Sequence, residues 1–138
     1  MTHVPPKRLS DALAEAEAAI SRISVCDARA LLGDPQVLFV DLRDVREIER
    51  FGGIKGAHCC ARGLLEFALD PESPYFREVF RQYDSYIFYC DNGLRATLAA
   101  HVAQQFGLKN VLALEGGLEH WMELGHRTEP LRWALEAA

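Results

Sequence analysis

Residues 86–100 read YIFYCDNGLRATLAA, and this run contains a strand signal followed by a helix signal. Its first four residues are β-branched or aromatic, which is typical of a buried strand. The apolar run stops at Cys90, and the turn-forming residues Asp91, Asn92 and Gly93 follow before a helical pattern begins. The sequence therefore predicts a cysteine at the carboxyl end of a strand, in a loop that leads into a helix.

This position has chemical consequences for the cysteine. In an open α/β sheet, ligands bind at the carboxyl ends of the strands. A loop that turns there presents successive backbone N–H groups, and these groups favour an anion together with the helix N-terminus. We therefore expect the thiolate form of Cys90 to be favoured and the residue to be nucleophilic, with Arg95 closing the loop.

The segments on either side of this run resemble the rhodanese (sulfurtransferase) domain family. The pattern Cys90-x-x-Gly93-x-Arg95 is followed by an Ala-rich helix and then by Gly107-Leu108-Lys109-Asn110-Val111, Leu114-Glu115-Gly116-Gly117, Trp121 and Gly125. Upstream, Asp41-Leu42-Arg43 and Gly53-Ile54-Lys55-Gly56-Ala57 resemble the Asp-Val-Arg and Gly-His-Ile-Pro-Gly-Ala segments of that family. The likeness covers roughly residues 23–126 and rests on five segments in the right order.

The resemblance implies a fold and a division of the chain. The expected fold is α/β, a three-layer α/β/α arrangement with a central five-stranded parallel sheet, preceded by an extra N-terminal helix. Residues 1–22 would form the helical extension, residues 23–127 the rhodanese-like domain, and residues 128–138 a helical tail packed on the domain.

The resemblance also implies an activity. Cys90 would take a sulfane sulfur from a donor such as thiosulfate or a persulfide, carry it as a covalent persulfide, and pass it to a thiol or cyanide, with no metal or organic cofactor. The loop that stabilises this sulfur would comprise Asp91, Asn92, Gly93, Leu94, Arg95 and Ala96. The resemblance implies supporting or substrate-binding roles for Asp41, Arg43 and Arg62, and Arg62 would steer an anionic donor. A sulfur-carrier protein is a further candidate acceptor.

The chain departs from the family pattern in two places. Gly53 and Lys55 stand where the family usually has His and Pro, and the segment 50–53 holds one extra residue. Asp91 places a carboxylate next to the cysteine, where it repels an anionic donor. We therefore expect thiosulfate to be a poor donor and a persulfide a better one.

Composition narrows the classes of partner and location. The 138 residues fit one domain, and the formal net charge of −5 argues against nucleic acid as a partner. No apolar run has the length of a membrane span and no signal peptide is evident, so a cytoplasmic location is the default expectation. The four cysteines lack zinc-site spacing and are expected to be thiols. Cys59 and Cys60 would either resolve the persulfide or pack in the core, and we favour the core.

Three further local patterns make structural predictions. Residues 9–23 show helical spacing of apolar residues, which predicts an amphipathic helix that either covers part of the domain or acts as a docking or dimer helix. The helix after Gly93 has one stripe of large apolar residues, namely Leu94, Leu98, Val102 and Phe106. Arg43 and Glu47 are four residues apart, a spacing that permits a salt bridge on a helix.

Three functions are compatible with a cysteine held in such a loop. The first is a sulfurtransferase, and the second is a binding module in which Cys90 senses oxidants or polysulfide without turnover. The third is a phosphatase or arsenate reductase, but those enzymes carry Cys-x5-Arg, whereas this chain has the shorter Cys90-x4-Arg95. The tighter loop suits a single terminal sulfur, so the sulfurtransferase is the preferred hypothesis.

Overall fold

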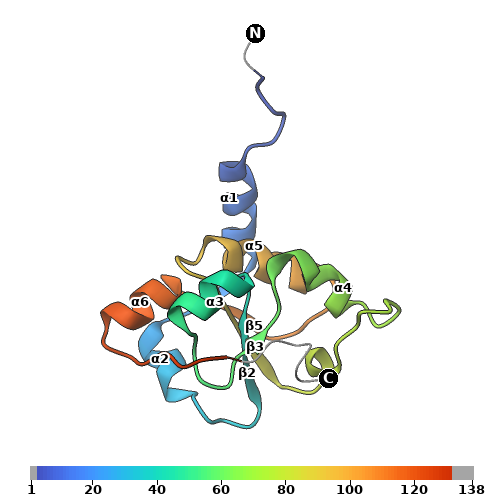
Figure 1. The fold of residues 1–138 in the computed structure, drawn as a ribbon. Coiled ribbons are helices and arrows are strands. Elements are labelled where there is room, and N and C mark those ends of the chain that lie inside the picture. The colour runs from blue at the N-terminus through green and yellow to red at the C-terminus, as the bar shows by residue number, and fades with distance from the viewer. Residues whose placement is uncertain (1–2, 132–138) are drawn as a thin grey trace.

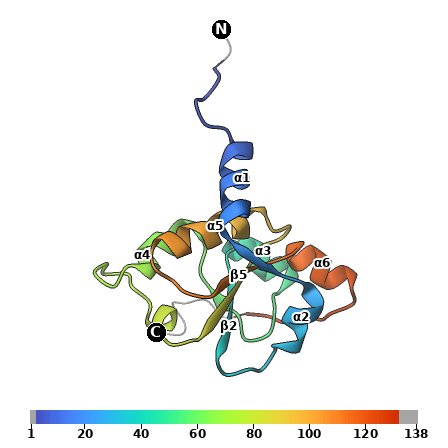
Figure 2. The same ribbon diagram turned by 180° about the vertical axis from the view of Figure 1, so that it is seen from behind.

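The computed structural model describes residues 3–131 and contains a five-stranded sheet with helices on both faces (Figures 1 and 2). The strand order is β1-β5-β4-β2-β3, and every neighbouring pair of strands is parallel. The strands are β1 (Ser21–Ile23), β2 (Val37–Asp41), β3 (His58–Cys59), β4 (Ser85–Tyr89) and β5 (Val111–Leu114). This architecture confirms the predicted α/β fold.

Helices connect each strand to the next, as a parallel sheet requires, and one further helix precedes the first strand and another follows the last. They are α1 (Leu9–Ala19), α2 (Val25–Ala30), α3 (Val45–Phe51), α4 (Leu65–Leu69), α5 (Leu94–Gln105) and α6 (Gly117–Glu123), with two short 3₁₀ helices, η1 (Arg62–Leu64) and η2 (Glu78–Arg81). No helix within the described part of the chain is both long enough and apolar enough to cross a membrane.

Alternation along the central strands divides the core into two layers. Tyr86, Phe88 and Cys90 face one side with residues of α4 and α5. Ile87 and Tyr89 face the other side with residues of α2 and α6. Because successive side chains of a strand point to opposite faces, both faces of β4 are buried, which explains its uninterrupted apolar sequence.

Helix α5 packs with its small residues against the sheet, so the predicted large apolar stripe was wrong. The buried side chains are those of Ala96, Ala99, Ala100 and Ala103, together with Thr97. Leu94 and Phe106 are each 47% exposed. Small side chains let the helix lie close to a sheet face that already carries two bulky aromatics from β4, Tyr86 and Phe88, and this close packing outweighs burial of the larger residues.

The N-terminal helix is shorter than predicted. Helix α1 ends at Ala19, because the chain then extends to pair with β5 as β1, in the register Ser21↔Leu112. The helix packs against α5 and projects from the rest of the molecule (Figure 1). Ala16 is its one buried residue, and Leu9 is 62% exposed.

The last residues that the structure describes form an extended segment near Glu129. Glu129 forms an antiparallel bridge with Gly53, through hydrogen bonds of 2.8 Å in both directions. The predicted helical tail extends to Ala138, and its residues 132–138, including Trp133, lie outside the described residues.

Candidate active site

Cys90 lies directly after β4, where the chain turns into α5. The backbone N–H of Gly93 donates a hydrogen bond to Cys90 Sγ at 3.2 Å. Gly93 is the N-terminal cap of α5 with a φ of +99°, a left-handed conformation that glycine adopts without steric cost. The side chain of Cys90 is fully buried. A sulfur anion at this position would therefore meet a donor N–H and the positive end of a 12-residue helix.

The backbone of the loop is held by the N-terminal end of α6. The N–H groups of Leu118 and Glu119 donate to the carbonyl oxygens of Cys90 and Asp91, each at 2.9 Å. In a trans peptide the C=O and the next N–H point in opposite directions. Anchoring these two carbonyls on α6 therefore turns the N–H groups of Asp91 and Asn92 away from α6.

Gly117 allows this close approach of α6 to the loop. A Cβ atom at this residue would lie 2.5 Å from the carbonyl oxygen of Asp91 and 2.8 Å from that of Cys90. The residue also has a φ of +64°, which side-chain-bearing residues rarely adopt. The site thus depends on a glycine far along the chain from the cysteine.

Arg95 is held by two carboxylates. Its Nη1 and Nη2 atoms donate to the two carboxylate oxygens of Glu47 at 2.9 and 2.6 Å, and Nη2 also donates to Asp91 Oδ1 at 2.9 Å. The Arg95 hydrogen bonds lower the pKa of Glu47 from its ordinary value. Burial raises the pKa of Asp91, but hydrogen bonds from Arg95 and from the Asn92 backbone N–H, together with the Arg95 charge, outweigh burial, so the net shift is downward. The Glu47 hydrogen bond is the largest cause of a raised Arg95 pKa.

The predicted pairing of Arg43 with Glu47 was wrong. Glu47 points back to the start of its helix, where it accepts the N–H of Asp44 at 3.0 Å while Asp44 accepts the N–H of Glu47 at 3.1 Å. This reciprocal capping box aims Glu47 at Arg95. The Asp44-x-x-Glu47 spacing was the sequence signal that could have indicated this orientation.

Arg43 instead forms a buried ion pair with Asp41. Its Nε donates to Asp41 Oδ1 at 3.0 Å and its Nη2 to Asp41 Oδ2 at 2.7 Å, and both side chains are at most 1% exposed. Burial lowers the pKa of Arg43, but the bond and charge of Asp41 outweigh it and the net shift is upward. Tyr89 packs beside this pair, and its hydroxyl accepts the N–H of Ile54 at 3.0 Å.

The buried pair explains why residue 53 is glycine. A Cβ atom at Gly53 would collide with the Leu131 side chain, and it would lie 2.8 Å from the Tyr89 hydroxyl and 3.0 Å from Asp41 Oδ2. A side chain at this position would displace Leu131, Tyr89 or Asp41, so the glycine suits the packing around the buried pair.

Arg62 lies at the same edge of the sheet but is paired with a neighbour. It begins η1 just after β3, and its Nη1 donates to Glu66 Oε1 at 2.8 Å. The Arg62 side chain is 31% exposed. Glu66 therefore neutralises part of the positive charge that Arg62 would offer to an anionic donor.

Cys59 and Cys60 are both buried in the sheet. Cys60 and Cys90 face the same core layer, but β2 lies between their strands, which separates their backbones by about 10 Å. A disulfide requires Cα atoms within about 7 Å. Burial raises the pKa of each of these two thiols to about 11. These observations favour a packing role for the pair over a resolving role.

Two cavities flank the loop. One, of about 260 Å³, is lined by Glu47, Asp91 and Glu119 together with Arg43 and the apolar residues Phe51, Leu118 and Met122. The other, of about 190 Å³, is lined in part by the loop residues Asn92, Gly93 and Leu94. Between residues 3 and 131, no group of three or more His, Cys, Asp or Glu side chains is arranged to hold a metal ion.

The structure has relatives among solved proteins. A protein of unknown function from Rhodopseudomonas palustris, described as a possible tyrosine phosphatase, is 43% identical over 94% of this chain and 99% of its own, with a TM-score of 0.90. A human single-domain sulfurtransferase is 25% identical over 76% of this chain and 97% of its own, with a TM-score of 0.64.

A thiosulfate sulfurtransferase from Pseudomonas aeruginosa shares the fold. It is 24% identical over 80% of this chain and 19% of its own, with a TM-score of 0.66. The sequence model of the rhodanese-like domain matches residues 24–124. That match spans four of the five strands, β2 to β5, together with the loop after Cys90, and β1 lies immediately before it. The chain therefore belongs to the rhodanese-like domain family.

Proposed function

We propose that the protein is a sulfurtransferase that carries a sulfane sulfur as a persulfide on Cys90. The observation that carries the proposal is the hydrogen bond from the Gly93 N–H to Cys90 Sγ, at the junction of a strand end and a helix N-terminus. Such a donor stabilises a thiolate before the reaction and a terminal persulfide sulfur during it. Membership of a family that includes sulfurtransferases supports the same reading.

The proposed reaction has two transfers. The Cys90 thiolate attacks the outer sulfur of the donor, a new S–S bond forms, and the donor leaves as a thiolate or, from thiosulfate, as sulfite. An acceptor thiolate or cyanide then attacks the outer sulfur of the persulfide, the S–S bond breaks, and Cys90 is regenerated as thiolate. Neither transfer consumes a metal, an organic cofactor or an external oxidant.

The charges near the loop favour a persulfide donor over thiosulfate. Glu47 and Asp91 share one cation, Arg95, so these three side chains carry a net negative charge. Glu119 adds a further carboxylate to the same cavity. A doubly charged anion is therefore repelled more strongly than a singly charged or neutral donor.

Mass spectrometry of the intact protein tests the proposal. After incubation with a small-molecule persulfide, the wild type should gain the mass of one sulfur atom, and cyanide should remove it with release of thiocyanate. Cys90→Ser should gain none, whereas Cys26→Ser, which removes the exposed cysteine, should behave as the wild type. Absence of Cys90-dependent thiocyanate release with every donor would contradict turnover and favour a sensing module.

A phosphatase is the second candidate, because the Rhodopseudomonas palustris relative is described as a possible tyrosine phosphatase. The six-residue loop from Cys90 to Arg95 argues against it, and so does the occupation of Arg95 by Glu47 and Asp91. An arginine paired with two carboxylates has few donors left for a phosphate. Cys90-dependent hydrolysis of p-nitrophenyl phosphate, without thiocyanate release, would reverse this preference.

A further inference from the structure

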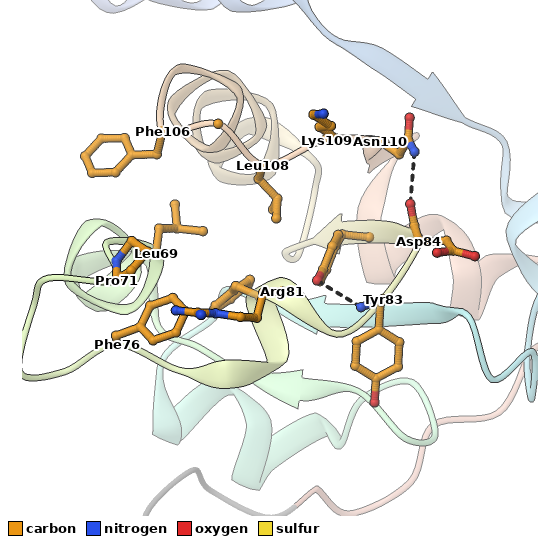
Figure 3. A pocket seen from close by; sticks show the side chains of 13 residues that line it. Leu69, Pro71, Phe76, Arg81, Tyr83, Asp84, Phe106, Leu108, Lys109 and Asn110 are labelled. Carbon is orange, nitrogen blue, oxygen red and sulfur yellow. Dashed lines mark hydrogen bonds between the residues drawn. The ribbon is translucent and has the colours of Figure 1, made fainter.

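A cavity of about 400 Å³ lies at the end of the sheet opposite Cys90 (Figure 3). It opens between the loop that follows α5 and the segment around η2, and it reaches Tyr86 near the start of β4. Cys90 comes after the other end of the same strand, about 13 Å away at the usual rise per residue. The cavity is therefore separate from the proposed sulfur-transfer site.

One half of the cavity is apolar. Leu69, Pro71, Phe76, Phe106 and Leu108 line it, and Figure 3 shows them gathered around the same space. Phe106 remains 47% exposed at the rim, where a bound molecule would cover it. A volume of this size and a lining of this kind are typical of sites for small organic molecules.

A cation lies within this apolar half. The Arg81 guanidinium stacks over the Phe76 ring, with its central carbon 4.5 Å from the ring centroid. Its Nε is 3.4 Å from Glu78, and its Nη atoms make no hydrogen bond with the residues that the structure describes. A guanidinium held flat against an aromatic ring keeps its outer N–H donors available for a carboxylate or a sulfonate.

Two other charged residues, Lys109 and Asp84, line the cavity. Lys109 adds a second positive charge and forms no ion pair among residues 3–131. Asp84 is the one acidic residue of the lining, and it lies at the opposite end of the cavity from Phe76 and Arg81 (Figure 3). Its backbone carbonyl accepts a hydrogen bond from Asn110 at 3.0 Å. The apolar half therefore pairs a hydrophobic wall with the Arg81 guanidinium, whose charge Glu78 offsets in part at Nε and whose Nη atoms are left as donors.

We propose that this cavity binds a small amphipathic organic anion. The apolar body of the ligand would pack between Leu69, Phe106 and Leu108, and its carboxylate or sulfonate would bind the Nη atoms of Arg81. This inference rests on the lining of the cavity and is independent of the chemistry proposed for Cys90.

An NMR titration of the full chain with octanoate, below its micelle concentration, tests the inference. We expect saturable shifts of the Leu108, Lys109 and Asn110 amides, and much weaker shifts with the neutral analogue 1-octanol. Arg81→Gln should weaken octanoate binding about tenfold, since it removes a charge-assisted hydrogen bond. Arg50→Gln is the matched control, because Arg50 also stacks on an aromatic ring, that of Phe51 at 5.3 Å, but does not line this cavity.

Three results would overturn the inference. These are no saturable shift with octanoate, equal binding of octanol and octanoate, or equal weakening by Arg81→Gln and Arg50→Gln. Shifts confined to residues 91–96 would instead assign octanoate to the cysteine loop and would also contradict it. Both arginines are substantially exposed, and the dispersion of each variant's spectrum reports whether its fold is retained.

Discussion

Arg95 follows Cys90 by five residues, a position at which we expected it to close the loop. Its guanidinium is bound to Glu47 and Asp91. Charge-assisted bonds of this kind fix the side chain firmly. Arg95 therefore orients the loop and offsets two carboxylates, while the backbone amide of Gly93 is the group that meets the sulfur.

Asp91→Asn should improve the use of thiosulfate. The change removes one negative charge beside Cys90 but leaves Arg95 bound to Glu47, so the loop keeps its main anchor. We expect about a tenfold rise in kcat/KM for thiosulfate in a cyanide assay, and a smaller gain at high salt, because salt screens partly exposed charges. Glu72→Gln, an exposed carboxylate in the loop before η2, is the control and should change nothing. An unchanged preference in Asp91→Asn would mean that donor choice is not electrostatic.

The sequence predicted the position of a single residue correctly where the signal lies in its neighbours along the chain. The end of an apolar run predicted that Cys90 follows a strand, and β4 does end at Tyr89. The partners of Arg95 and Arg43 were not predictable in this way. Glu47 and Arg95 are 48 residues apart, and only the packing of α3 beside the loop brings them together. The four-residue spacing of Arg43 and Glu47 was misleading, because Arg43 precedes the helix and Glu47 belongs to it.

At the scale of elements, the two ends of the loop depend on different helices. Helix α5 supplies the positive end that meets the sulfur, and α6 holds the carbonyl oxygens on the other side. The start of helix α5 after Gly93 was predicted, but the face that it buries was not. Periodicity selects the largest apolar stripe, whereas a helix lying close to aromatic residues of a sheet buries alanines.

Gly117→Ala should disable the loop far more than Gly125→Ala does. Both glycines have positive φ, at +64° and +83°, so both alanines carry a similar backbone cost of about 1 kcal/mol. A Cβ at Gly117 also collides with the carbonyls of Asp91 and Cys90, whereas nothing lies within 4 Å of a Cβ at Gly125. We expect Gly117→Ala to lose roughly 1–3 kcal/mol more in urea unfolding, and to form the persulfide at least tenfold more slowly.

Equal rates of persulfide formation in the two glycine variants would contradict the proposed anchoring of the loop by α6. Equal losses of unfolding free energy would show that backbone strain, and not the collision with the loop, sets the cost of both changes.

At the scale of the whole molecule, the sheet order brings distant segments to one edge. Cys90 follows β4, Asp41 ends β2 and Cys60 follows β3, and these three strands lie side by side in that order. The family resemblance, carried by five motifs over roughly residues 23–126, was enough to predict the five-stranded parallel sheet. The position of α1 was less predictable, because a helix that is mostly exposed leaves only a weak apolar pattern.

The edge strand β3 is tied to the rest of the molecule by His58. Arg77, which precedes η2, donates through Nη1 to His58 Nε2 at 3.0 Å and to the Cys59 carbonyl at 2.8 Å. Since arginine can only donate, Nε2 accepts and the imidazole is neutral. Burial and the Arg77 charge lower the pKa of His58 from 6.5 to about 4. The His58 ring also packs edge-on against Phe80, with centroids 6.0 Å apart.

This arrangement predicts that stability falls as the solution is acidified. Between about pH 6.5 and pH 4 the unfolded chain binds a proton at residue 58 and the folded chain does not, so unfolding becomes easier as pH drops through that window. The loss between about pH 7 and pH 5 should be roughly 2 kcal/mol in urea unfolding. His58→Gln keeps an acceptor for Arg77 but cannot titrate, so it should flatten the pH dependence by that amount. The pKa values of Glu47 and Asp91 are lowered, so these carboxylates lose their contribution to folding stability mainly at lower pH. That loss should be the same in the wild type and in His58→Gln. A wild type and variant with parallel stability curves from pH 7 to pH 5 would show that His58 is protonated without cost in the folded state.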